Sequence, residues 1–229
     1  MHPIDVVVFD HDGTLVNSLA VVAEASNSVL STFGYERRTV AEIVAGMVHP
    51  TAPRLGLLTG VTDPEIQKQM ARLYGEAALK CSGLAVLYPG IEGTLEELRT
   101  LGLQLAVLSN SEGIFIRTIL ERLGVASRFF RLVGEDDMPA PKPDPRGLLR
   151  MLELAGSEPQ RSVYVGDSRT DLETARAAGL IAIGVTWGAH TRRELEDFGF
   201  DALIDEPAQL TVLLKSRSAS RPGNRSFSR

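Results

Sequence analysis

The sequence predicts an α/β protein with a doubly wound, Rossmann-like parallel sheet as its core and a small inserted α-helical cap domain. Two observations predict the core: short apolar runs alternate with helical patterns, and most of these runs end in polar or charged residues. A third predicts the insertion, because about 70 residues separate the first predicted strand from the helix before the second.

Six apolar runs have the composition of parallel strands that are buried on both faces. Each is followed by small, polar or charged residues that can end a strand. The expected strands are Val6–Phe9, Leu103–Leu108, Phe129–Val133, Val163–Val165, Ile181–Val185 and Ala202–Ile204.

Apolar residues at helical spacing predict the connections between the strands. One stripe runs from Ile91 to Leu101 before Gly102, and another runs from Ile116 to Leu123 before Gly124. Strands that alternate with helices of this length form right-handed crossovers and an open parallel sheet.

The long connection is itself helical in pattern, with apolar faces between Leu19 and Leu30 and between Ile66 and Leu79. We therefore expect residues 1–16 and 88–214 to form the Rossmann-like core and residues 17–87 to form the helical cap. The insertion point places the cap over the carboxyl ends of the strands, where open α/β sheets bind ligands.

The charge balance excludes some classes of partner. The 229 residues include 24 Lys and Arg against 29 Asp and Glu, a net charge of −5 that argues against nucleic acid or an anionic membrane as the main partner. The single Cys81 excludes an intramolecular disulfide. Without an apolar run of membrane-spanning length or a signal-peptide pattern, we expect a cytoplasmic protein.

The last residues, 215–229, differ from the rest of the chain. They hold five basic and no acidic residues, and their apolar residues show no periodicity. Such a segment buries too little surface to offset its ordering entropy, so we expect a disordered basic tail.

Asp10 and Asp12 follow the first strand, separated by one residue, and Gly13 allows a tight exit from it. Nothing in the fold requires acids at this position, and desolvating a carboxylate is costly unless a cation or hydrogen bonds compensate. Taken alone, the two acids could also form an Asx turn at the strand end.

Three further groups of polar residues lie at or near later strand ends: Ser109-Asn110, Lys142, and Asp167 with Asp171. Each has a structural alternative, namely a helix N-cap, a solvated lysine and helix capping, respectively. All of these groups converge at one edge of the sheet, however. Carboxylates, a hydroxyl and an ammonium group there suit a hard divalent cation and a phosphoryl group.

In these motifs the sequence resembles the haloacid dehalogenase-like superfamily, in its phosphoglycolate phosphatase-like branch with a small helical cap. The run from Asp10 to Leu15 is similar to the first motif of the superfamily, and Ser109-Asn110 to the second. Lys142, in Lys-Pro-Asp-Pro, is similar to the third, and Gly166–Ser168 with Asp171 to the fourth. The resemblance covers residues 4 to about 214.

The resemblance implies a Mg2+-dependent phosphatase that acts through an aspartyl-phosphate. Asp10 would be the nucleophile, and Asp12 the general acid and base. Ser109 and Lys142 would hold the phosphoryl oxygens, and Asn110 would contribute its backbone N–H.

The metal residues implied by the resemblance are Asp10, Asp12 through its main-chain carbonyl, and Asp167. Asp171 would support the metal shell or the lysine. His11 and Asn17 depart from the family pattern, in which phenylalanine and aspartate are more usual. Because side chains alternate along a strand, we expect His11 to point away from the site and to affect packing only.

Substrate selectivity should come from the cap, since the core recognises only phosphate and metal. We expect Gly46–Arg54 to be a substrate-facing loop in which Arg54 pairs a carboxylate or a second phosphate. A surface cation is the alternative for Arg54.

Two other functions remain open from the sequence: a sugar-phosphate phosphomutase with the same core, and a catalytically silent phosphate-binding protein. The expected partner is a small phosphorylated metabolite, and the expected assembly is a monomer or a homodimer. Phosphoglycolate, a sugar phosphate, a nucleotide monophosphate and pyrophosphate all suit the same core.

Overall fold

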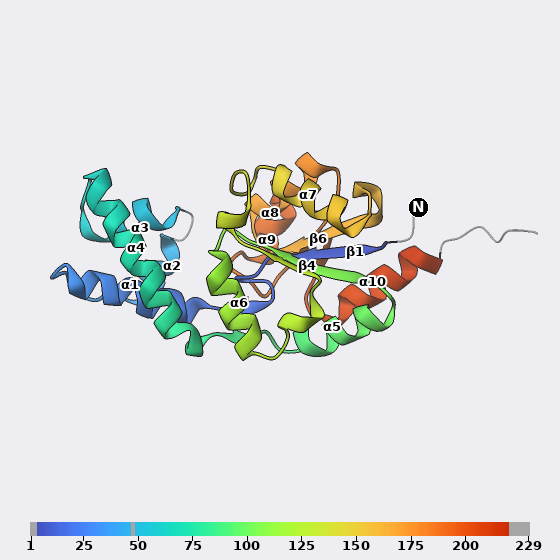
Figure 1. The fold of residues 1–229 in the computed structure, drawn as a ribbon, viewed down its shortest axis with the longest axis horizontal. Helices are drawn as coiled ribbons and strands as arrows, with labels where there is room; N and C mark the ends of the chain where they lie inside the picture. The colour runs from blue at the N-terminus through green and yellow to red at the C-terminus, as the bar shows by residue number, and fades with distance from the viewer. Residues whose placement is uncertain (1–3, 47–48, 220–229) are drawn as a thin grey trace, which may run out of the picture.

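The core of the protein is a six-stranded parallel sheet (Figure 1). The computed structural model describes residues 4–46 and 49–219. The strand order is β5-β4-β1-β6-β7-β8, which confirms the predicted doubly wound sheet. The strands are β1 Val6–Phe9, β4 Gln104–Leu108, β5 Arg131–Val133, β6 Ser162–Gly166, β7 Ile181–Val185 and β8 Ala202–Ile204.

The strand β1 lies inside the sheet, between β4 and β6, and its side chains alternate between the two faces. Val7 and Phe9 pack on one face, and Val6 and Val8 pack on the other. The first face is covered by α5 (Ile91–Thr100), α6 (Gly113–Arg122) and α10 (Ala208–Ala219). The second face is covered by α7 (Arg146–Ala155) and α8 (Arg169–Ala178), and α9 (Arg192–Phe198) packs beside α8 and β8.

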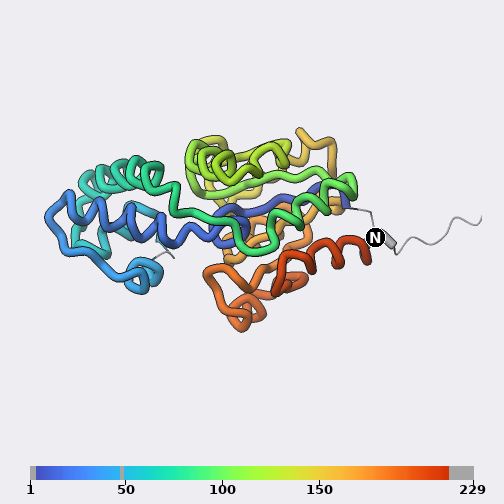
Figure 2. Tube along the Cα trace, turned by 90° about the horizontal axis from the view of Figure 1, so that it is seen from below, coloured from blue at the N-terminus to red at the C-terminus, as the bar shows by residue number. Residues whose placement is uncertain are grey.

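Four α-helices of the described residues, all between Asn17 and Val86, form what we call the α1–α4 module. In both views the module lies beyond the carboxyl ends of the sheet strands (Figure 1 and Figure 2). Its helices are α1 Leu19–Thr32, α2 Val40–Ala45, α3 Thr51–Thr59 and α4 Pro64–Cys81. A cluster that includes Val29, Leu55 and Met70 joins α1, α3 and α4.

A short antiparallel pair of strands forms the stem of this module, where the chain leaves the core and returns. The strands are β2 (Val16–Asn17) and β3 (Val86–Leu87), and Val16 pairs with Leu87. This pair is not predicted from the sequence, because two-residue strands are too short to show an alternating pattern.

The C-terminal helix corrects part of the predicted disordered tail. Helix α10 runs on to Ala219, so residues 215–219 are helical, while residues 220–229 lie outside the described residues. Leu210 and Leu214 anchor this helix in the core. The following residues Lys215 to Ala219 include no helix breaker, so the helix continues beyond its buried part.

Short 3-10 helices connect several elements, at Ser82–Leu84, Ala126–Arg128, Glu135–Asp137 and Pro159–Arg161. Within residues 4–46 and 49–219, no helix has both the length and the apolar character that crossing a bilayer requires.

Candidate active site

Asp10 lies directly after β1, buried at the carboxyl end of the sheet. Its backbone N–H donates to Val165 O (2.9 Å), which continues the pairing of β1 with β6. The chain then turns at Gly13, where φ is +78°. A Cβ atom on Gly13 would clash with Oδ2 of Asp167, so this turn requires glycine for both its conformation and its space.

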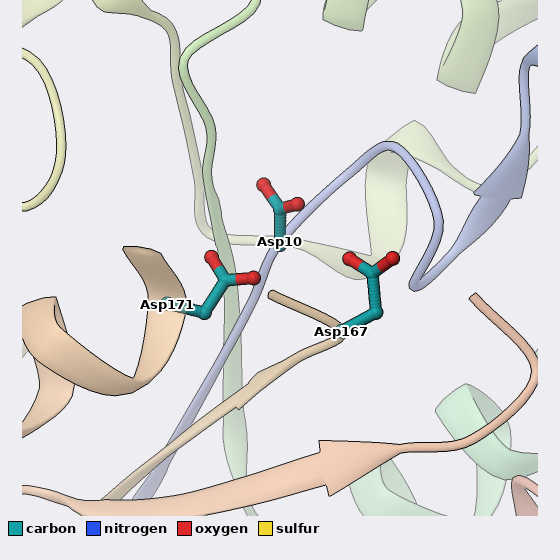
Figure 3. A group of neighbouring side chains, drawn as sticks. All are labelled: Asp10, Asp167 and Asp171. Carbon is teal, nitrogen blue, oxygen red and sulfur yellow. The ribbon is translucent and has the colours of Figure 1, made fainter. Parts of the chain in front are cut away.

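Three buried carboxylates meet at this edge: Asp10 after β1, Asp167 after β6 and Asp171 in the first turn of α8. One oxygen from each lies within 4.8 Å of the others, and Figure 3 shows the three side chains around one region. Burial and the charges of Asp171 and Asp10 raise the pKa of Asp167 to about 8. Burial raises the pKa of Asp10 to about 6, although Lys142 opposes the shift. Oxygen donors that repel one another in this way fit a hard divalent cation.

Lys142 binds two of these three carboxylates. Its Nζ donates to Asp10 Oδ1 (2.8 Å), to Asp171 Oδ1 (2.6 Å) and to the Tyr164 hydroxyl (3.1 Å). Burial acts to lower the pKa of Lys142, but the charges of Asp10 and Asp171 raise it well above its usual value. The side chain is 4% exposed, so the alternative of a solvated lysine is wrong.

Tyr164 and Asn110 hold this lysine in place. The Tyr164 hydroxyl accepts from Lys142 Nζ and donates to Leu108 O (2.7 Å). The Asn110 side chain binds the Lys142 backbone twice, since Oδ1 accepts from its N–H (2.7 Å) and Nδ2 donates to its carbonyl (3.1 Å). Tyr164 is not predicted as a site residue from the sequence, because it lies within an apolar strand run.

Asp12 points to a different set of partners. Ser111 Oγ donates to its Oδ2 (2.6 Å), and Ser109 Oγ accepts from the Ser111 N–H (3.3 Å). Burial acts to raise the pKa of Asp12, but the charge of His11 and hydrogen bonds from His11, Ser111 and Ser18 lower it below its usual value. The Asp12 carboxylate is therefore not one of the three grouped carboxylates, although its charge acts on Asp10. Ser111 and Ser18 are site residues that were not predicted from the sequence.

The expectation for His11 is wrong in one respect. Strand β1 ends at Phe9, so the alternation of side chains does not reach residue 11. His11 is fully buried with Nδ1 3.2 Å from Asp12 Oδ2, and its ring packs edge-on against Phe115. The residue thus contributes to packing and also adjoins the predicted acid and base. Asn17, the other departure, accepts from the Leu19 N–H (3.3 Å) where α1 begins.

The loop after β7 supports Asp167 from the other side. The Ala189 N–H donates to Asp167 Oδ2 (2.6 Å), and His190 Nδ1 lies 3.0 Å from the Asp167 carbonyl oxygen. Gly188 leaves the space for this carboxylate, because a Cβ atom there would overlap it. This loop was not predicted to be part of the site, although it follows the end of a predicted strand as the other motifs do.

Arg54 lies in α3 and not in a loop, because the helix begins at Thr51. The side chain is 5% exposed, so the alternative of a surface cation is wrong. Its guanidinium carbon lies 5.0 Å from the centre of the Tyr74 ring in α4. Arg54 is thus part of the interior of the α1–α4 module.

Comparisons with known proteins agree with this geometry. A model of the family described as haloacid dehalogenase-like hydrolase matches residues 7–185. A phosphoglycolate phosphatase from Pseudomonas putida is 32% identical over 209 residues, which are 87% of this chain and 76% of the relative. A phosphoglycolate phosphatase from Haemophilus influenzae is 33% identical over 219 residues, which are 90% of this chain and 96% of the relative.

Solved structures share the fold over nearly the whole chain. A haloacid dehalogenase-like hydrolase from Bacteroides fragilis has a TM-score of 0.83 and 29% identity, covering 90% of this chain and 99% of its own. A predicted phosphoglycolate phosphatase from Haemophilus somnus has a TM-score of 0.84 and 26% identity, covering 93% of this chain and 99% of its own. The chain therefore belongs to the haloacid dehalogenase-like hydrolases, in their phosphoglycolate phosphatase-like branch.

Proposed function

We propose that this phosphatase hydrolyses a small phosphomonoester similar to phosphoglycolate, with Mg2+ as its cofactor and an aspartyl-phosphate as its intermediate. The observation that carries the proposal is the position of the Asp10 carboxylate, which is buried beside both the Lys142 ammonium and the carboxylates of Asp167 and Asp171. A carboxylate held between a cation and a metal site is suited to attack phosphorus.

In the first step, an Asp10 oxygen forms a bond to phosphorus while the bond to the ester oxygen breaks. Asp12 gives its proton to the leaving alkoxide. In the second step, water attacks the same phosphorus, Asp12 takes a proton from that water, and inorganic phosphate leaves with the Asp10 carboxylate restored. The pKa of Asp12 is low in the free protein. The negative charge of an arriving phosphate raises the pKa of a nearby carboxyl group, so that Asp12 can hold the proton that it donates.

Lys142 would hold one phosphoryl oxygen, and the Ser109 hydroxyl and the Asn110 backbone N–H would hold others. Ser109 lies buried after β4, at the same edge of the sheet as Asp10. Asn110 also acts through its side chain, because its two hydrogen bonds fix the Lys142 backbone.

The residues suited to Mg2+ are Asp10, Asp167 and the main-chain carbonyl of Asp12. Asp171 accepts a hydrogen bond from Lys142 Nζ and would support the residues that bind the metal. Mg2+ would supply positive charge that offsets the repulsion among the carboxylates and the phosphoryl oxygens.

The α1–α4 module would act as the cap that closes over the substrate. Its place beyond the carboxyl ends of the strands supports this role (Figure 2). The names of the relatives suggest phosphoglycolate or a similar small phosphorylated metabolite as the substrate.

Phosphate release from a panel of phosphorylated metabolites tests the proposal. The wild-type protein should release phosphate in the presence of Mg2+ and stop after chelation. Asp10→Asn should keep the fold and lose turnover, since the amide has the same shape but is a poor nucleophile. Full activity of Asp10→Asn, or of the chelated wild type, would show that the mechanism is wrong.

A further inference from the structure

Arg54 is a buried cation to which the described part of the chain offers no acidic partner. Its Nε and Nη2 atoms are buried without a hydrogen-bond partner, and no Asp or Glu of the described residues lies within ion-pair distance of it. A charge removed from water without a counter-charge is strongly unfavourable. The ring of Tyr74 offsets only part of this cost.

The acidic side chains of the α1–α4 module that form ion pairs have other partners. Glu24 pairs with Arg37 at 2.6 Å on the exposed side of the module. Glu42 lies 3.9 Å from Arg38, and Glu76 lies 3.8 Å from Arg72. None of these pairs includes Arg54, so its charge is not balanced from within the module.

Tyr74 indicates where in the molecule this guanidinium lies. It packs against the main core cluster and also against the cluster of Val29, Leu55 and Met70, so it lies where the module meets the core. Burial raises the pKa of Tyr74 and the Arg54 charge opposes this, while the charge of Asp12 raises it further. Tyr74, the ring against which the Arg54 guanidinium lies, is therefore within electrostatic range of the predicted acid and base.

We propose that Arg54 binds a second anionic group of the substrate, an oxyanion at the end remote from the reacting phosphate. This inference rests on the proposed phosphatase function and narrows its substrate class to acidic phosphomonoesters. The guanidinium presents several N–H donors in one plane, which matches a carboxylate or a phosphoryl group. Such a group would supply the counter-charge that the module lacks.

The test compares two esters that differ only at the remote end: 2-phosphoglycolate, which carries a carboxylate, and 2-hydroxyethyl phosphate, which carries an alcohol. In Arg54→Met, kcat/KM for 2-phosphoglycolate should fall about 10- to 100-fold, while kcat/KM for 2-hydroxyethyl phosphate should change less than about threefold. Ethylene glycol bisphosphate is a third arm, since a larger loss with this ester would identify a phosphoryl group as the preferred anion.

Arg72→Met is the matched control, because Arg72 lies in α4, is exposed, and carries the same charge. It should leave the ratio of the two kcat/KM values unchanged. Binding of 2-phosphoglycolate to Asp10→Asn, measured by calorimetry, should weaken by a similar factor when Arg54→Met is added. This readout does not depend on turnover.

A purely structural role for Arg54 gives a different result. In that case Arg54→Met would lower the melting temperature and reduce kcat/KM equally for both esters, and this outcome would overturn the proposal. If Arg54→Met lacks a cooperative unfolding transition, Arg54→Lys replaces it in the test. The selectivity is the ratio of kcat/KM for 2-phosphoglycolate to kcat/KM for 2-hydroxyethyl phosphate. A fall of at least about threefold in this ratio supports the proposal, and an unchanged ratio overturns it. Failure of the phosphatase assignment itself would appear as no phosphate release by the wild type from either ester.

Discussion

The ammonium group of Lys142 lies 2.8 Å from the carboxylate of Asp10, a residue 132 positions away in the sequence. Both side chains are buried, so the pair forms in an environment where an unpaired charge is unfavourable. In this contact Lys142, which follows β5 in the chain, lies at the carboxyl end of β1. It also means that the predicted nucleophile is held in place before any substrate arrives.

Lys142→Met should destabilise the protein at pH 8. The substitution leaves the carboxylates of Asp10 and Asp171 without their cation, and breaking a buried pair in this way costs about 3–5 kcal/mol. The loss should be smaller at pH 5, below the pKa of about 6 at Asp10, because that carboxyl can then take up a proton. Urea unfolding of metal-free protein at both pH values measures the effect. Lys68→Met, at an exposed position, is the control and should match the wild type.

Tyr164→Phe should lower activity on every phosphate ester by a similar factor. The change removes one of the three partners of Lys142 Nζ and leaves Leu108 O without its donor. An unsatisfied buried group costs about 1–3 kcal/mol, so stability should fall by a comparable amount. The melting temperature and kcat/KM for two unrelated esters test this expectation. Tyr35→Phe, in the module, should change neither, and a loss confined to one ester would contradict a role through Lys142.

The sequence predicted the sheet well because its strands are short apolar runs with clear ends. Ile181–Val185 and Ala202–Ile204 have the observed bounds, whereas the strand expected at Phe129–Val133 begins at Arg131. The motifs after these strands are close in space because parallel strands end at one edge. Lys142, which lies in the loop after β5, reaches Asp10 and Asp171 as part of the same arrangement.

Other features depend on three-dimensional contacts that no pattern in the chain reveals. Tyr164 looks like a core residue in sequence, and only the fold places its hydroxyl beside Lys142. His11 was assigned to the far face because the alternation of β1 was extended two residues past the end of the strand at Phe9, where it no longer applies. Arg54 was assigned to a loop, yet α3 begins at Thr51. Pro53 lies in the first turn of this helix, where proline is tolerated.

The stability of the metal-free protein should fall as the pH rises from 5 to 8. The pKa of Asp167 is about 8 in the folded protein against 3.8 ordinarily, so the folded state keeps a proton that the unfolded state releases over this range. Asp167→Asn removes this proton uptake and should raise the melting temperature at pH 8 while abolishing activity. Added Mg2+ should stabilise the wild type at pH 8 and have much less effect on the variant.

Melting curves recorded with a chelator from pH 5 to pH 8 measure the slope of melting temperature against pH. Asp197→Asn, at an exposed position of α9, is the control and should keep the slope of the wild type. A slope in Asp167→Asn that equals the wild-type slope would show that Asp167 is already ionised in the metal-free protein.

Asp12→Ala should slow the release of a poor leaving group much more than the release of a good one. An alkyl alkoxide needs a proton as it leaves phosphorus, whereas an activated phenolate leaves without one. General acid catalysis is worth about 10²–10⁴-fold, so kcat/KM for an alkyl phosphate should fall within that range. The loss for 4-nitrophenyl phosphate should be far smaller.

The second step offers an independent measurement on the same variant. Asp12 also serves as the base for water, so in Asp12→Ala the aspartyl-phosphate should accumulate and be detectable by mass spectrometry after acid quenching. Ser111→Ala is a milder variant of the same site, because it removes the 2.6 Å hydrogen bond to Asp12 but leaves the Asp12 carboxylate in place. Its losses should have the same dependence on leaving group and be smaller. Equal losses for both esters in Asp12→Ala would assign this residue to binding and would require another group to donate the proton.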